Sequence, residues 1–204
     1  MLKTRIAVFV SGGGTNLQAL LDAQSAGKLT AGEIVLVLSS SCNAYALTRA
    51  ANAGVESAVC SRKALGSQEA FEAAIEAELA AHKIDMIVLA GFMSILSRDF
   101  TDKWPERIVN VHPSLIPSFC GQGFYGLRVH EAALERGVKV TGATVHFVNE
   151  IPDGGRILLQ KAVSIEDGDT PEVLQRRVME QAEWILLPQA VQMVAEEIAK
   201  EKAL

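Results

Sequence analysis

Four short runs, three of them continuously apolar and the fourth interrupted only by Asn110, most constrain how this chain can fold. They cover residues 6–10, 34–38, 86–90 and 108–111, and the segments between them carry apolar residues at helical spacing. Strands without polar alternation are expected where helices cover both faces of a parallel sheet, because neither face of the strand then meets water. We therefore predict a doubly wound, Rossmann-like α/β fold with a mostly parallel sheet and helices on both faces.

The second half of the chain has a different pattern. Residues 140–148 alternate, with Thr144 and His146 on the side opposite Val145 and Phe147, which predicts a strand with one face less buried. Residues 157–165 form the next expected strand, antiparallel to the first through the turn at 151–155. A helix is then expected to begin at Thr170-Pro171, and a final helix to run towards Lys202 with Pro188 inside it. Antiparallel strands are therefore added to the sheet in the C-terminal half.

Composition and charge exclude several classes of function. The net charge of −5, without a basic cluster, argues against general binding to nucleic acid or to a membrane surface. The apolar run at 6–10 is too short for a membrane span or a signal peptide, so a cytoplasmic protein is expected. Cys42, Cys60 and Cys120 are widely spaced, which predicts neither a disulfide framework nor a zinc site. No metal is expected, because no His pair at i, i+4 and no Cys-His grouping occurs.

Three consecutive glycines, Gly12, Gly13 and Gly14, stand between the first apolar run and a helical segment. Glycines allow the backbone to approach a ligand closely, and the N–H groups at a helix start favour an anion such as phosphate. No Gly-Lys-Ser/Thr follows, so this is not a P-loop. Dinucleotide binding also fits poorly, because no acidic residue follows Leu38 to hold a ribose diol. A phosphate monoester fits better, and a tight turn without a ligand is the alternative.

The segment Asn110-Val111-His112-Pro113, at the end of the fourth apolar run, is the strongest catalytic signal. Alternation along an extended strand puts Asn110 and His112 on one side, so that both polar groups can meet one reacting atom. Asp153, in a Pro-Asp-Gly-Gly turn, is either ordinary turn chemistry or a third member of this site. A carboxylate beside His112 is expected to raise the pKa of the imidazole and favour its charged form. These groups can stabilise an oxyanion and move a proton, so the nucleophile would be the substrate.

Five segments of this chain, in order, closely resemble phosphoribosylglycinamide formyltransferase. They are Ser11-Gly12-Gly13-Gly14-Thr15-Asn16-Leu17-Gln18, residues 89–96, residues 110–117, residues 142–148 and Asp153-Gly154-Gly155. The resemblance implies transfer of a formyl group from 10-formyltetrahydrofolate to the amine of glycinamide ribonucleotide, in purine biosynthesis. It also implies a single formyltransferase domain over residues 1–204. Residues from about 1 to 107 would form the phosphate-binding half and those from about 108 to 204 the catalytic and folate-binding half, in a monomer or homodimer.

The same resemblance assigns roles to individual residues. Asn110, His112 and Asp153 match the catalytic residues: Asn110 and protonated His112 would donate to the oxyanion, and Asp153 would support the imidazolium. Gly14, Thr15 and Asn16 match the loop that holds the substrate phosphate, and Glu183 matches an acidic residue near that substrate. Residues matching the folate site are Gln68, Met93, Ser94, Ile95, Leu96, Asn110, Asn149 and Asp153.

This chain departs from the family pattern at three places. Gln68 and Ser94 stand where family members often have arginine, so a donor to the glutamate tail of the folate is absent at each position. One extra residue separates Glu183 from Val178. The segment 120–126 is long and glycine-rich, and we expect it to act as a mobile flap beside the site.

Three alternative functions share parts of this pattern. Formyltetrahydrofolate deformylase would pass the formyl group to water, but it usually carries an N-terminal regulatory domain, for which residues 1–6 leave no room. Methionyl-tRNA formyltransferase needs a C-terminal nucleic-acid-binding domain and a basic surface, neither of which is expected here. A non-catalytic module that binds a phosphoribosyl ligand is the third alternative.

Overall fold

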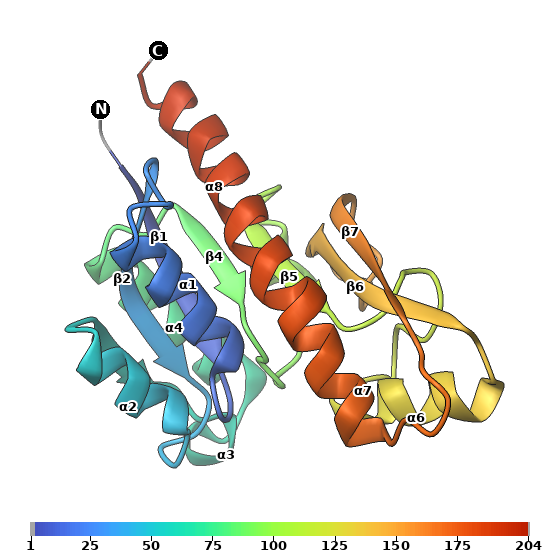
Figure 1. The fold of residues 1–204 in the computed structure, drawn as a ribbon. Helices are drawn as coiled ribbons and strands as arrows, with labels where there is room; N and C mark the ends of the chain where they lie inside the picture. The colour runs from blue at the N-terminus through green and yellow to red at the C-terminus, as the bar shows by residue number, and fades with distance from the viewer. Residues whose placement is uncertain (1–2, 204) are drawn as a thin grey trace.

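A computed structural model describes residues 3–203 of the chain, while Met1, Leu2 and Leu204, at the ends of the predicted domain, lie outside the described residues. Figure 1 shows a twisted sheet with helices on both sides. The strands are β1 (Thr4–Val10), β2 (Gly32–Ser39), β3 (Glu56–Val59), β4 (Met86–Leu89), β5 (Ile108–His112), β6 (Val140–Phe147) and β7 (Ile157–Ser164). The α-helices are α1 (Thr15–Ser25), α2 (Tyr45–Asn52), α3 (Arg62–Leu65), α4 (Gln68–Ala81), α5 (Arg98–Thr101), α6 (Leu127–Arg136), α7 (Pro171–Val178) and α8 (Trp184–Glu201).

The strand order in the sheet is β3-β2-β1-β4-β5-β6-β7. Strands β1 to β5 are parallel to their neighbours, and β6 and β7 are antiparallel additions. Strands β1 and β4 are parallel neighbours, so the loops that follow them lie at the same edge of the sheet, and the strand order reverses between them. Ligands of open α/β sheets bind at such a switch point. The predicted fold class is confirmed.

Two apolar cores lie on opposite faces of the sheet. Along β1, Ile6 and Val8 point into the core that α1, α2 and α8 cover, whereas Ala7 and Phe9 point into the core that α4 and α5 cover. All four side chains are fully buried. Burial on both faces explains why this strand has no polar alternation in the sequence.

Strand β6 corrects one prediction. Thr144 and His146 were expected on a less buried face, but their side chains are buried, with 0% and 1% of the residue surface exposed. The loop after β5 covers this face: the Thr144 hydroxyl donates to the carbonyl of Ser114 (2.7 Å) and accepts from the N–H of Ile116 (3.1 Å). Hydrogen bonds compensate for removing these polar groups from water, so polar alternation here does not mean exposure.

The C-terminal helical region begins as predicted at Thr170, whose side chain accepts the N–H of Val173 at the start of α7. It then contains a π-helical segment, η1 (Met179–Glu183), before α8. A π-turn accommodates one more residue than an α-turn. Glu183 is the last residue of this segment. Pro188 lies inside α8, one turn after its start.

Candidate active site

Asn110 and His112 lie on one side of β5, as their spacing predicts. In the antiparallel register with β6, Asn110 lies opposite His146 and His112 opposite Thr144. Nδ2 of Asn110 is 3.1 Å from Nε2 of His146. The side chains of Asn110 and His146 therefore lie on the same face of the sheet, on the neighbouring strands β5 and β6.

The orientation of His112 is fixed by a backbone carbonyl. Nε2 of His112 lies 2.9 Å from the carbonyl oxygen of Phe119, and a carbonyl oxygen can only accept a hydrogen bond. Nε2 therefore carries a proton, and Nδ1 is the nitrogen that gains or loses one. Nδ1 faces Asp153, 3.5 Å from its Oδ2. This arrangement presents the titrating nitrogen of the ring to the carboxylate.

Asp153 comes from the β6–β7 loop, which folds back over the face of β5 and β6. Its Oδ2 accepts the N–H of Gly121 (2.8 Å), and its Oδ1 lies 3.5 Å from Nε2 of His146. The backbone of Asp153 is left-handed, with φ of 56°, a conformation that costs free energy for a residue other than glycine. The structure thus brings the three predicted catalytic side chains together and adds His146 to them.

Burial dominates the pKa of His112. Removal from water lowers the pKa of the imidazole, and the attraction of Asp153 and the hydrogen bond to Phe119 only partly oppose it. Asp153 thus raises the pKa of His112 as expected, but burial outweighs this effect and the net shift is downward. For Asp153, burial raises the pKa, but the nearby ring of His146, the hydrogen bond from the N–H of Gly121 and the attraction of His112 lower it by more, so the net shift is downward. The resting pair is a neutral imidazole beside a carboxylate.

The glycine loop connects β1 to the N-terminus of α1. Gly14 has a left-handed backbone, with φ of 71°, and a Cβ there would lie 2.7 Å from the Cβ of Ala46 on α2. Only glycine fits this position without displacing α2. Gly12 and Gly13 are exposed, beside the N–H groups of the first turn of α1. The loop is therefore shaped to admit an anion close to the backbone.

Glu183 lies beside this loop. Its Oε2 accepts the Nδ2–H of Asn16 at 2.7 Å, and only 6% of the residue surface is exposed. Burial raises the pKa of Glu183 to about 7, and the hydrogen bond from Asn16 opposes the shift. Glu183, at the end of the π-helical segment, therefore contacts Asn16 near the start of α1. Thr15 is also predicted to bind the substrate phosphate. Its hydroxyl oxygen lies 3.7 Å from the sulfur of Met179 in η1.

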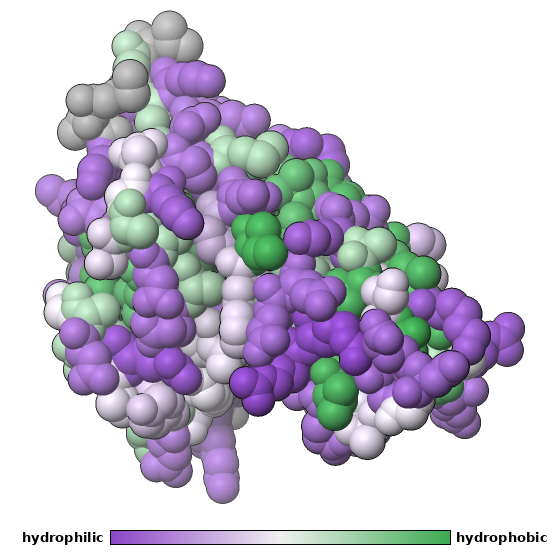
Figure 2. Space-filling model, viewed as in Figure 1, coloured by the Kyte–Doolittle hydropathy of each residue, from purple (hydrophilic) through white to green (hydrophobic). Residues whose placement is uncertain are grey.

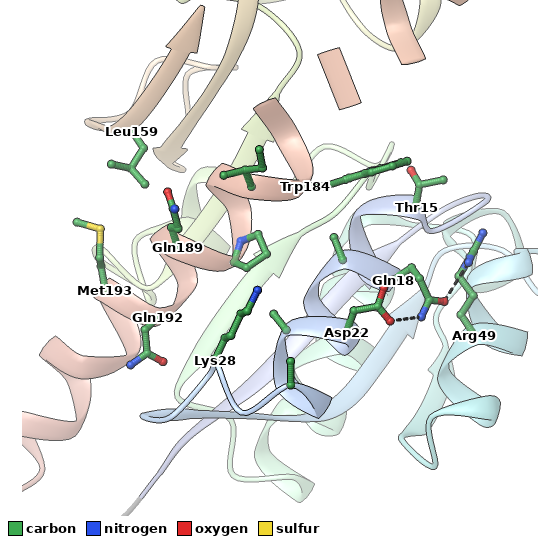
Figure 3. Close-up of a pocket in the computed structure, with 15 residues that line it drawn as sticks. Thr15, Gln18, Asp22, Lys28, Arg49, Leu159, Trp184, Gln189, Gln192 and Met193 are labelled. Carbon is green, nitrogen blue, oxygen red and sulfur yellow. Dashed lines mark hydrogen bonds between the residues drawn. The ribbon is translucent and has the colours of Figure 1, made fainter. Parts of the chain in front are cut away.

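Arg49 on α2 was missed by the sequence predictions. Its Nε donates to the carbonyl of Gly13 (2.8 Å) and one terminal nitrogen donates to Oε1 of Gln18 (2.9 Å), as Figure 3 shows in part. A positive charge is thereby held against the glycine loop. The sequence offered one signal for Arg49, a single basic residue in the last turn of α2, which is the second helix after the glycine loop.

A groove of about 900 Å³ lies between α1 and α8, and Arg49 and Thr15 form its end nearest the glycine loop (Figure 3). None of the three predicted catalytic residues lines it. This side of the molecule is mostly hydrophilic, with separate apolar patches (Figure 2). The groove is therefore separate from the cluster around His112.

The predicted folate segment follows β4. Met93 and Ile95 are exposed (54% and 69%), while the side chain of Leu96 is buried in the core under α4. The N–H of Met93 donates to the Oγ of Ser11 (2.9 Å), and the carbonyl of Ile95 accepts from Nε2 of Gln68 (3.0 Å). The backbone of this segment is thus tied to the glycine loop and to α4.

Two other residues of the predicted folate site lie in different settings. Ser94 is half-buried between the exposed Met93 and Ile95. Asn149 begins the β6–β7 loop, where its Oδ1 accepts the N–H of Ile151 (3.0 Å). Asn149 therefore shapes the loop that carries Asp153.

Within residues 3–203, no helix has the length and apolar character needed to cross a membrane.

Comparison with known proteins identifies the family. Residues 4–191 match the formyl transferase family. The chain is 40% identical to phosphoribosylglycinamide formyltransferase of Haemophilus influenzae, with 94% of this chain and 87% of that protein covered. It is 45% identical to the trifunctional purine biosynthetic protein adenosine-3 of Gallus gallus, with 95% of this chain but 18% of that protein covered. The chain thus spans less than a fifth of this longer relative.

A solved structure agrees with the sequence comparison. The crystal structure of glycinamide ribonucleotide transformylase 1 from Symbiobacterium toebii superimposes with a TM-score of 0.89 at 42% identity, over 96% of this chain and 89% of that one. The chain belongs to the formyl transferase family and, within it, to the phosphoribosylglycinamide formyltransferases.

Proposed function

We propose that this protein transfers a formyl group from 10-formyltetrahydrofolate to the amine of glycinamide ribonucleotide, in purine biosynthesis. The observation that carries the proposal is the cluster in which Asn110, His112 and Asp153 meet on one face of β5 and β6. Acyl transfer to an amine needs a donor for the oxyanion and a group that moves a proton, and this cluster supplies both. No protein nucleophile is required, because the substrate amine attacks directly.

The phosphate of glycinamide ribonucleotide would bind at the glycine loop. Gly14, Thr15 and Asn16 offer backbone N–H groups at the N-terminus of α1, where the helix dipole favours an anion. Arg49 adds a positive charge behind the loop. Glu183, held by Asn16, would accept hydrogen bonds from the ribose hydroxyls.

The folate would bind between two loops. One contains Met93, Ser94, Ile95 and Leu96, and the other runs from Asn149 to Asp153. The exposed side chains of Met93 and Ile95 offer apolar contacts to a flat pteridine ring. Gln68 contacts the first loop from α4 and would lie near the tail of the folate, together with Ser94.

The chemistry follows from the protonation state of His112. The amine nitrogen attacks the formyl carbon, a C–N bond forms, and the carbonyl electron pair moves to oxygen, where an N–H of Asn110 donates to the oxyanion. Neutral His112 accepts a proton from the attacking nitrogen at Nδ1, and Asp153 stabilises the resulting imidazolium. The bond from carbon to N10 of the folate then breaks. N10 takes the proton from His112, which returns to its neutral form.

An assay with purified protein tests this proposal. Consumption of 10-formyltetrahydrofolate is measured with glycinamide ribonucleotide and without any acceptor. Transfer that depends on the acceptor supports the proposal. Equal consumption without it would indicate a hydrolase, and no consumption in either case would indicate a binding module. Either of these two results rejects the proposed transferase.

A further inference from the structure

We infer that His146 is a positioning residue that fixes the carboxamide of Asn110 with its amide nitrogen turned towards the imidazole. The inference deepens the proposed function and rests on it. His146 has 1% of its surface exposed and lies on β6 directly opposite Asn110. Its position makes it a neighbour of the reacting groups without placing it against the substrate.

The tautomer of His146 follows from its own hydrogen bond. Nδ1 lies 2.7 Å from the carbonyl oxygen of Phe147, which can only accept, so Nδ1 carries a proton. In the neutral ring, Nε2 then has a lone pair and accepts a hydrogen bond. Nε2 is 3.1 Å from Nδ2 of Asn110 and 3.5 Å from Oδ1 of Asp153. The shorter contact assigns the lone pair to Asn110.

This hydrogen bond decides which way the carboxamide faces. The oxygen and nitrogen of an amide have nearly the same size, so packing alone does not distinguish the two orientations. A lone pair on His146 accepts only from the NH₂ group. Within residues 3–203, the Asn110 side chain makes no other hydrogen bond.

The orientation matters for catalysis. One N–H of the Asn110 amide donates to His146. The second N–H is therefore available to the oxyanion that forms on the formyl oxygen. In the reverse orientation the amide oxygen would occupy this position and repel the oxyanion. His146 thus acts on the reaction through Asn110.

Two variants of His146 and one control test the inference. His146→Leu removes the acceptor, and His146→Gln restores one through its side-chain oxygen. Thr141→Val is the matched control, because Thr141 is buried on the same strand and its hydroxyl has no partner among the described residues. We expect His146→Leu to lower kcat by about tenfold to hundredfold with little change in either KM, less than the loss on removing Asn110. His146→Gln should recover part of the loss, and Thr141→Val should keep the kcat of the wild type.

A double-variant comparison separates positioning from structural damage. In an Asn110→Ala background, His146→Leu should lower kcat by less than about twofold, because there is no carboxamide left to orient. If the two losses multiply, or if Thr141→Val loses as much activity as His146→Leu, the inference is wrong.

A spectroscopic measurement on ligand-free protein keeps the inference distinct from the proposed function. Long-range ¹H–¹⁵N spectra of the imidazoles should show His146 neutral and protonated at Nδ1. The carboxamide protons of Asn110 should shift in His146→Leu and not in Thr141→Val. A proton on Nε2 of His146 would overturn the inference even if the enzyme is active. Failure of wild-type formyl transfer would instead reject the proposed function.

Discussion

The Nε2 nitrogen of His112 lies 2.9 Å from the carbonyl oxygen of Phe119, seven residues further along the chain. This contact fixes the tautomer of the ring and turns Nδ1 towards Asp153. The neighbouring residue Gly121 donates its N–H to the same carboxylate. The segment after Pro117 therefore orients both members of the pair, and its geometry is part of the site.

His130 on α6 predicts a loss of stability in acid. Its ring has no hydrogen-bond partner among the described residues, and burial, with a smaller repulsion from His112, lowers its pKa to about 4. The unfolded chain therefore binds a proton below about pH 6.5 that the folded protein does not bind until about pH 4. Between these values the free energy of unfolding falls as pH falls, by about 2 kcal/mol at pH 4.5. In urea unfolding, the free energy of the wild type should fall more steeply between pH 6.5 and pH 4 than that of His130→Leu, and parallel curves would contradict the prediction.

For Glu183 we expect the opposite dependence, in which its contribution to the free energy of unfolding falls as pH rises. Its pKa is raised to about 7, so the folded protein keeps a proton that the unfolded chain loses above about pH 4.5. Its contribution to stability is present at low pH and is lost as pH rises through 7, and charging the buried group costs about 3 kcal/mol. Relative to wild type, Glu183→Gln should become more stable as pH rises from 5 to 8. Denaturant unfolding at the two pH values measures this difference, and a constant difference would refute the assignment.

We expect position 155, two residues after Asp153, to require glycine. A Cβ at Gly155 would overlap the carbonyl oxygen of Phe147, so Gly155→Ala must displace the β6–β7 loop. We expect a loss of about 1–3 kcal/mol in stability and a fall in kcat of at least tenfold. Gly168→Ala is the control for backbone strain without overlap, because Gly168 has a left-handed φ of 85°, which Gly155 does not have, and a Cβ there meets no atom within 4 Å. A control that loses kcat equally would show that the effect is not specific to the loop.

Arg49 predicts a selective effect on the phosphate-bearing substrate. Arg49→Met removes the hydrogen bonds to Gly13 and Gln18 and the nearby charge. The KM for glycinamide ribonucleotide should rise about tenfold, while the KM for the folate should stay the same, in steady-state kinetics. Arg49→Lys should not restore binding, because an ammonium group cannot reproduce the simultaneous hydrogen bonds to Gly13 and Gln18. An equal rise in both KM values would place Arg49 outside the phosphate site.

The central strands β1 and β4 could be predicted because they are buried on both faces and appear as unbroken apolar runs. Ile6 to Val10 illustrate this, since their alternate side chains enter two separate cores. β6 was harder to predict, because Thr144 and His146 look like an exposed face until the loop after β5 covers them. Local pattern does not contain that tertiary contact.

The same limit applies to the candidate site. Asn110 and His112 are neighbours in sequence, so their convergence follows from strand geometry. The pairing of Asn110 with His146 depends on the register of β5 against β6, which no local pattern gives. The effect of Asp153 on the pKa of His112 was predicted correctly, but the larger opposing effect of burial was not, because the extent of that burial depends on distant segments of the chain.

The turnover of His112→Ala with saturating 10-formyltetrahydrofolate and glycinamide ribonucleotide tests the central claim most directly. His112 moves the proton between the two nitrogens, so we predict that kcat falls by about hundredfold or more, while calorimetric binding of glycinamide ribonucleotide is largely unchanged. A His112→Ala enzyme that turns over at the wild-type rate would contradict the account.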